Sequence, residues 1–149
     1  MSYSDLVNED IKKAMLAREK DKLEAIRAIK AAFIVARADK GANSVLEEAD
    51  ELKIIAKLVK QRKDSATIYI EQKRPDLAEK EIMEAGIIEK YLPAQMDEAE
   101  IEAVVKKIIT ESGAAGMKDM GKVMGLATKE LSGKADGKVI SNLVKKLLA

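Results

Sequence analysis

The side chains that could do chemistry in this chain are carboxylates, lysines, tyrosines and hydroxyls. The sequence has no cysteine and no histidine, which excludes thiol nucleophiles, histidine bases, Ser-His-Asp relays and zinc sites built from Cys or His. Adjacent carboxylates occur at Glu47-Glu48, Asp50-Glu51 and Asp97-Glu98. Each pair falls at an expected helix start or on a charged face, where the helix dipole and solvent account for it. We therefore expect no catalytic residue, no metal site and no cofactor.

One nucleotide-binding motif is matched in part. Residues 116–122 agree with the first seven positions of a P-loop. The eighth position is Val123, which has no hydroxyl to hold magnesium, and no strand is expected before it. We interpret the match as chance.

Glycines and lysines recur near the C-terminus in a pattern that packing alone does not require. Gly121 and Gly125 lie four apart, so on a helix they share a face and allow either close approach by a ligand or tight helix packing. Residues 133–138 surround an expected helix start, whose outward amides and neighbouring lysine would suit an anion. The alternative for Gly133 is a helix cap. The candidate binding residues are Gly121, Lys122, Gly125, Gly133, Lys134, Gly137 and Lys138.

The lysines of this stretch produce a local excess of positive charge. The whole chain carries 27 basic and 26 acidic residues, a net charge of +1. From residue 117 onward, seven lysines stand against three acidic residues, a local net charge of +4. Such an excess can bind phosphates. The alternative is a solvated face with lysines at helix ends, as Lys145 and Lys146 would be.

A second basic patch is predicted at Lys57, Lys60 and Lys63, whose spacing of three places them on one helix stripe. Arg62 sits about 100° further round the helix. It could extend the positive surface or form a salt bridge with Glu81 or Glu84, and we favour the salt bridge.

Nearly every segment has the pattern of a helix. Apolar residues recur at spacings of three and four, and no segment alternates as a strand does. Capping boxes at Asp21, Ser44 and Asp97, each with a glutamate three residues later, predict helix starts. Pro75 predicts a further start and Pro93 a stop. The predicted helices lie at 3–19, 21–40, 45–73, 75–91, 97–112, 118–130 and 136–148.

The pattern predicts an all-α protein of two domains. Residues 1–92 should form a bundle of four helices with short, antiparallel connections. Residues 93–96 should be a hinge, and 97–149 a small three-helix tail domain. No apolar run reaches the roughly 18–20 residues of a membrane span, and the N-terminus has no secretory signal. We expect a cytoplasmic location without membrane contact.

The C-terminal motifs carry a family resemblance. Residues 119–125 and 132–138, with the apolar-periodic terminus, resemble the tail domain of the B subunit of the glutamine-dependent aspartyl/glutamyl-tRNA amidotransferase. With 60–65 and 89–93 added, essentially the whole chain is similar to the free-standing YqeY-like relatives of that tail. The resemblance implies contact with the folded body of tRNA. The positions that it carries over are Gly121, Lys122, Gly125, Gly133, Lys134, Asp136, Gly137 and Lys138.

The aromatic residues limit how the tail could bind RNA. All four lie before Pro93: Tyr3, Phe33, Tyr69 and Tyr91. Base stacking is therefore unavailable in the tail. Its lysines would contact RNA phosphates, so that the tail would recognise the backbone and shape of the RNA. Our leading expectation is a non-catalytic protein that binds tRNA or another folded RNA. The alternatives are amide transfer from glutamine to charged tRNA, implied by the resemblance only, and a helical protein-interaction module with a protein partner.

Overall fold

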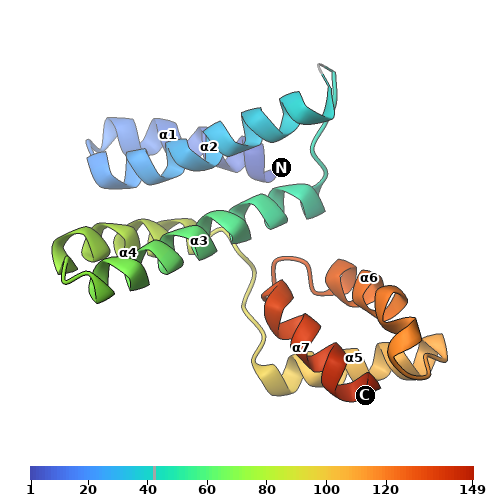
Figure 1. The fold of residues 1–149 in the computed structure, drawn as a ribbon. Coiled ribbons are helices and arrows are strands. Elements are labelled where there is room, and N and C mark those ends of the chain that lie inside the picture. The colour runs from blue at the N-terminus through green and yellow to red at the C-terminus, as the bar shows by residue number, and fades with distance from the viewer. Residues whose placement is uncertain (42) are drawn as a thin grey trace. The chain divides into compact units, whose positions relative to one another are not determined.

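The computed structural model describes residues 1–41 and 43–149. These residues contain seven α-helices, one short 3₁₀ helix and no strand (Figure 1). The prediction of an all-α protein is confirmed. The chain forms two compact units, Met1–Leu92 and Pro93–Ala149.

The N-terminal unit consists of two helical hairpins. Its helices are α1 (Tyr3–Leu16), α2 (Lys20–Lys40), α3 (Glu48–Glu71) and α4 (Pro75–Glu89). Figure 1 shows α1 beside α2 and α3 beside α4. Helix α2 contacts both helices of the second hairpin, and α1 also reaches α3.

The core of the N-terminal unit lies where the apolar stripes of its helices meet. Ile26, Ile29 and Phe33 of α2 are buried, and they meet Ile55 and Val59 of α3. Full burial of a side chain of this size contributes about 1.5–3 kcal/mol. Helices α2 and α3 therefore supply most of the large core residues of the unit.

Side-chain hydrogen bonds anchor the start of helix α1. The hydroxyl of Ser2 accepts a hydrogen bond from the amide of Asp5, and the Asp5 carboxylate accepts one from the amide of Ser2, both at 3.1 Å. The buried carboxylate of Glu51, on α3, accepts bonds from the amide and hydroxyl of Ser4 at 2.7 and 2.8 Å. These bonds fix the start of α1 against α3.

One of the three predicted capping boxes is confirmed. Asp97 caps α5, where its carboxylate accepts from the amide of Glu100 at 2.8 Å and the Glu100 carboxylate accepts from the amide of Asp97 at 3.2 Å. The box at Asp21 is wrong, because α2 already begins at Lys20.

The box predicted at Ser44 is also wrong. The hydroxyl of Ser44 donates to the carbonyl oxygens of Arg37 and Gly41, both at 2.8 Å, and so closes the end of α2. Helix α3 starts at Glu48, where the carboxylate of Asp50 accepts from the amide of Glu47 at 3.2 Å. The cap thus lies three residues later than predicted.

Helices α1 and α3 end earlier than predicted because each is followed by a residue in the left-handed region. Arg18 has φ 58° and Lys73 has φ 59°. The amide of Glu19 then donates back to the carbonyl of Ala14 at 3.0 Å, and the end of α3 has the equivalent bond. This is the Schellman arrangement, which normally uses glycine.

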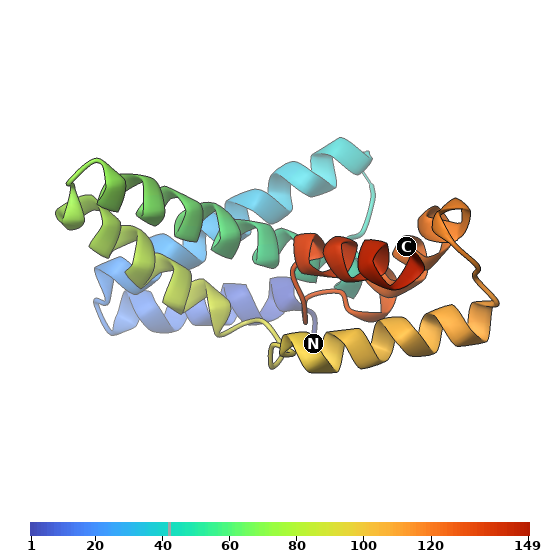
Figure 2. The ribbon, with the colours of Figure 1, turned by 60° about the horizontal axis from the view of Figure 1, so that its bottom comes forward.

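The C-terminal unit packs three helices on one another in pairs. They are α5 (Glu98–Ser112), α6 (Met120–Glu130) and α7 (Gly137–Leu148), with the 3₁₀ helix η1 (Met117–Asp119) before α6. Figure 2 shows α7 lying along α5. The buried core residues are Ile101, Val105, Ile108, Val123, Ala127, Leu131, Ile140, Leu143, Val144 and Leu148. Because η1 precedes α6, the helix predicted at 118–130 begins as a 3₁₀ turn.

The described residues lack two features. None of their helices combines the length and apolarity needed to cross a membrane. No group of three or more carboxylates among them could hold a metal ion.

Candidate nucleic-acid interface

Helix α6 exposes its backbone at two glycines. Gly121 and Gly125 are both exposed, and a Cβ atom added to either would meet no atom within 4 Å. The fold therefore does not need these glycines for helix packing, and the packing interpretation is wrong. The main chain of α6 is open to close approach from outside.

Lys122 lies between these glycines and faces the end of α5. Its ammonium donates to the carbonyl oxygen of Ser112 at 3.4 Å. An open groove of about 540 Å³ runs between α5 and α6. Its lining residues are Ile108, Glu111, Ser112, Lys122, Leu126, Lys129 and Glu130. Sequence reasoning missed Leu126, which is 44% exposed. Its position outside the helix face of the buried Val123 and Ala127 could have indicated this exposure.

The loop between α6 and α7 is fixed by the segment before α5. Gly133 is buried and adopts φ 75°, and its carbonyl accepts from the side-chain amide of Gln95 at 2.7 Å. The carbonyl of Lys134 accepts from the amide of Met96 at 2.9 Å. Gly133 is thus required by the turn, while the side chain of Lys134 remains exposed. Gln95 and Met96, from the predicted hinge 93–96, are anchored to this loop.

The start of α7 does not present free amides as the sequence suggested. The carboxylate of Asp136 accepts from the amide of Lys138 at 2.9 Å and caps the helix. An anion placed there would meet this carboxylate, which already complements the helix dipole. The amides of Gly137 and Lys138 are therefore a poor phosphate site. The exposed side chain of Lys138 keeps its charge available.

The predicted binding residues fall into two groups along α6. Gly121, Lys122 and Gly125 lie in its N-terminal half, whereas residues 133–138 follow its C-terminal end. From Gly121 to Glu130 the helix rises about 14 Å. The geometry offers two contact regions for an extended ligand and not one enclosed pocket.

The lysines of η1, α6, α7 and the loop between α6 and α7 form no ion pairs. All seven are exposed: Lys118, Lys122, Lys129, Lys134, Lys138, Lys145 and Lys146. The structure describes every residue of 93–149, and the ion pairs of this range are Lys106–Glu102 at 3.3 Å and Lys107–Glu111 at 4.0 Å, both on α5. Asp119 instead accepts from the amide of Ala115 at 2.8 Å. The positive charge of this surface is uncompensated by salt bridges.

The second basic patch is partly neutralised. Lys63 pairs with Glu89 at 3.0 Å. Arg62 pairs with Glu84 at 3.0 Å, with the two side chains only 16% and 12% exposed, so the salt bridge predicted for Arg62 is confirmed. Lys57 and Lys60 are exposed, and no ion pair in the described part of the chain involves them.

Several relatives among known proteins share the name Altered inheritance of mitochondria protein 41, mitochondrial. The protein of Clavispora lusitaniae is 42% identical over 92 residues, which cover 60% of this chain and 52% of that protein. The protein of Kluyveromyces lactis is 36% identical over 111 residues, covering 70% and 57%. The protein of Pyrenophora tritici-repentis is 30% identical over 143 residues, covering 93% and 77%. The chain spans just over half the length of the first two.

These names overturn one prediction, and the family match confirms another. The relatives are named as mitochondrial proteins, which contradicts the cytoplasmic location expected from the sequence. The family described as Yqey-like protein matches residues 4–148. Because the match covers almost the whole chain, the protein belongs to the YqeY-like family.

Proposed function

We propose that this protein binds folded RNA, with tRNA as the first candidate, through the surface formed by η1, α6 and α7. The observation that carries the proposal is the set of seven exposed lysines without an ion pair in residues 93–149. Phosphate oxygens would supply the partners that the protein does not.

The surface suits recognition of backbone and shape. The exposed main chain at Gly121 and Gly125 lets a phosphate backbone approach α6 without meeting a side chain. Residues 93–149 contain no aromatic side chain, so base stacking cannot contribute there. The proposal takes residues 1–92 as a helical bundle and 97–149 as the tail domain that holds the RNA site, without catalysis of its own.

A protein-interaction module is the second candidate. Met117 and Leu126, 49% and 44% exposed, offer apolar contact area on or near the same helix as the lysines. Capture of a protein that survives nuclease and high salt would favour this function, because phosphate contacts weaken steeply with salt. The enzymatic alternative, amide transfer from glutamine to charged tRNA, is tested by ammonia release from glutamine.

The test is the affinity of the protein for bulk folded tRNA across a salt series. The variant Lys122→Ala, Lys134→Ala, Lys138→Ala should bind more weakly, and its log–log salt slope should be shallower by about two units, since each phosphate contact adds somewhat under one. The variant removes one lysine from α6, one from the loop and one from α7, so it samples both contact regions.

A control variant removes the same number of positive charges, but from lysines that form ion pairs. In Lys63→Ala, Lys106→Ala, Lys107→Ala, all three lost lysines form ion pairs in the structure. This variant should keep most of the affinity and the slope. Equal losses in both variants would show that net charge, and not this surface, drives binding. Absence of binding by the unaltered protein would refute the proposal.

A further inference from the structure

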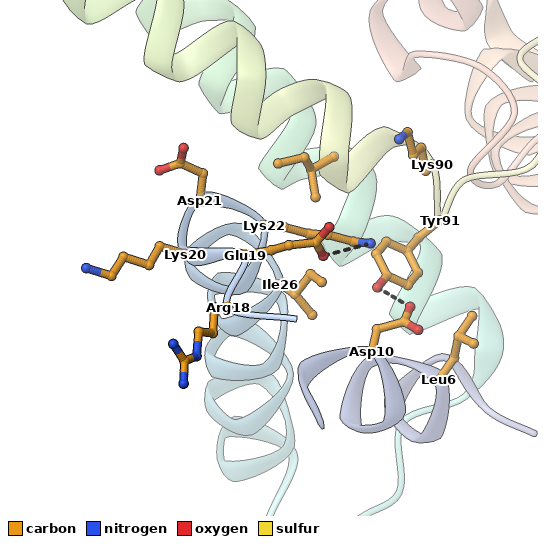
Figure 3. Close-up of a pocket in the computed structure, with 11 residues that line it drawn as sticks. Leu6, Asp10, Arg18, Glu19, Lys20, Asp21, Lys22, Ile26, Lys90 and Tyr91 are labelled. Atoms are coloured by element: carbon orange, nitrogen blue, oxygen red, sulfur yellow. Dashed lines mark hydrogen bonds and ion pairs between the residues drawn. The ribbon is translucent and has the colours of Figure 1, made fainter. Parts of the chain in front are cut away.

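The N-terminal unit contains a cavity that the proposed RNA surface does not use. It lies between α1, the turn into α2 and the end of α4, and has a volume of about 860 Å³ (Figure 3). Ligand pockets typically measure about 300–1,000 Å³. All of its lining residues belong to the unit Met1–Leu92. The cavity is large enough for a small organic molecule.

Part of the cavity lining is apolar and includes an aromatic ring held by a hydrogen bond. Leu6, Ile26 and Ile87 line the cavity together with Tyr91. The hydroxyl of Tyr91 donates a hydrogen bond to the carboxylate of Asp10. Burial, and then the bond to Asp10, raises the pKa of Tyr91, so the phenol stays protonated and remains a donor at physiological pH. The bond holds the ring in one position, which lowers the entropy lost when a ligand packs on it.

The lining of the cavity also supplies positive charge. Lys22 lies 3.6 Å from the carboxylate of Glu19, with both side chains about half exposed. Such an exposed pair contributes little, so Lys22 can exchange Glu19 for an anionic ligand. Figure 3 shows Lys22 reaching toward Tyr91, whereas Arg18 and Lys20 point away from the ring. Lys90, adjacent to Tyr91 in sequence, forms no ion pair among the described residues.

We propose that this cavity binds a nucleotide, with the base on Tyr91 and the apolar side chains and the phosphate at Lys22 and Lys90. A flat ring system can pack on the aromatic ring and the apolar side chains, and a phosphate can pair with the two lysines. Asp10 lines the cavity and keeps acceptor capacity beyond its bond to Tyr91. A carboxylate accepts from exocyclic amino groups, so adenine and cytosine fit better than uracil.

This site is distinct from the RNA surface and rests on different residues. The nucleotide could be free, or it could be an unstacked nucleotide of an RNA strand, since both present the same chemistry. A base bound here would supply the stacking that residues 93–149 cannot provide.

The experiment titrates the full chain with AMP, CMP, UMP and inorganic phosphate, followed by heteronuclear NMR. AMP and CMP should shift the signals of residues around Tyr91, UMP should bind more weakly, and phosphate should bind more weakly than any nucleotide. Tyr91→Leu should weaken AMP binding by about tenfold or more through lost stacking. Tyr91→Phe should keep most of the affinity because the ring remains. Lys22→Ala combined with Lys90→Ala should weaken AMP binding by about tenfold or more.

Two controls separate this site from general effects. Lys30→Ala removes an exposed lysine of α2 outside the cavity and should leave AMP binding unchanged. The variant Lys122→Ala, Lys134→Ala, Lys138→Ala should also leave it unchanged, whatever becomes of tRNA binding. Circular dichroism of every variant identifies a loss of fold, and the lysine variant decides the question if Tyr91→Leu unfolds.

Other outcomes would overturn the assignment. Phosphate binding as tightly as AMP would mean that the ring has no role. Unchanged AMP binding after Lys22→Ala and Lys90→Ala, or no binding at all, would mean that the cavity is not a nucleotide site. If AMP binds as proposed, a short single-stranded RNA that competes with it identifies an RNA strand as a source, and failure to compete identifies the free nucleotide.

Discussion

The N-terminal unit differs from the last part of the C-terminal unit, residues 117–149, in whether basic side chains form ion pairs. In residues 1–92, ion pairs of the described residues hold six of the 18 basic side chains: Lys22, Lys40, Arg62, Lys63, Arg74 and Lys80. In residues 117–149, seven lysines are exposed and none forms an ion pair. Net charge hides this difference, because the whole chain carries only +1. The seven unpaired lysines are available to a ligand, whereas five of the six pairs in residues 1–92 are exposed and contribute little to the stability of the fold.

The units also differ in whether residues other than glycine adopt a positive φ angle. The N-terminal unit ends α1 and α3 with Arg18 and Lys73 in the left-handed region, where a side chain is strained. The C-terminal unit uses Gly113, Gly116 and Gly133 at its positive φ angles. Exposed helical glycines with no atom within 4 Å of an added Cβ occur in both units, among them Gly86 of α4 and Gly121 and Gly125 of α6. Each interior glycine of a helix costs about 1 kcal/mol relative to alanine. An exposed helical glycine such as Gly125 therefore lowers the stability of the helix without a packing reason.

The largest effect on stability is expected from Arg62 in the N-terminal unit. Arg62→Ala should lower the free energy of unfolding by about 2–3 kcal/mol, because it leaves the largely buried carboxylate of Glu84 without its partner. Urea unfolding followed by circular dichroism measures this change. Binding of tRNA should not change.

The matched control is Lys63→Ala in the same helix. Its pair with Glu89 is exposed, with side chains 56% and 40% accessible. The loss should stay below about 1 kcal/mol. Equal destabilisation by the two variants would contradict the distinction between the buried and the exposed pair.

Replacing Gly125 should change stability and binding in opposite directions. Gly125→Ala should raise the free energy of unfolding by about 1 kcal/mol, since the new methyl group meets no atom within 4 Å and alanine favours the helix. The same methyl group would stand between α6 and a phosphate backbone, so the affinity for tRNA should fall. Urea unfolding and tRNA titration of one preparation test both signs. A more stable protein with unchanged affinity would show that RNA does not approach α6 at this point.

The helices and their buried faces could be predicted from the sequence because helical periodicity is a local property. Ile101, Val105 and Ile108 of α5 are buried, as are Ile140 and Leu143 of α7, in the spacing that the pattern indicated. Pro75 begins α4 as predicted. These features depend on residues three or four apart, which a sequence displays directly.

The remaining features depend on contacts between distant residues. The buried bond between Ser4 and Glu51 joins positions 47 apart, and the anchoring of Gly133 by Gln95 joins positions 38 apart. The ends of α1 and α3 were misplaced because Arg18 and Lys73 occupy positions where glycine is the usual signal. The openness of Gly121 and Gly125 was also beyond local reasoning, since it depends on what the neighbouring helices leave uncovered.

The left-handed turn after α3 gives a test on the N-terminal unit with a smaller effect. Lys73 is exposed and has φ 59°. Lys73→Gly should relieve a backbone strain of about 1–2 kcal/mol but increase the entropy of the unfolded chain. The net gain in the free energy of unfolding should be about 0.5 kcal/mol. Urea unfolding measures it, and Gly113→Lys in the C-terminal unit should show the reverse sign. A loss of stability in Lys73→Gly would contradict the strain argument.

The smallest effect is a pH dependence at the start of α3. The pKa of Asp50 lies below its ordinary value, first because its carboxylate accepts from the ammonium of Lys40, and then from the amide of Glu47. A carboxyl group with a lower pKa in the folded state stabilises the protein above its unfolded pKa of about 3.9. That stability is lost as the pH falls through the folded pKa. Asp50→Asn should therefore be less stable than the unaltered protein at neutral pH, and the difference should shrink below about pH 4. Urea midpoints of both proteins over this range test the sign, and a difference that persists unchanged in acid would assign it to lost geometry and not to charge.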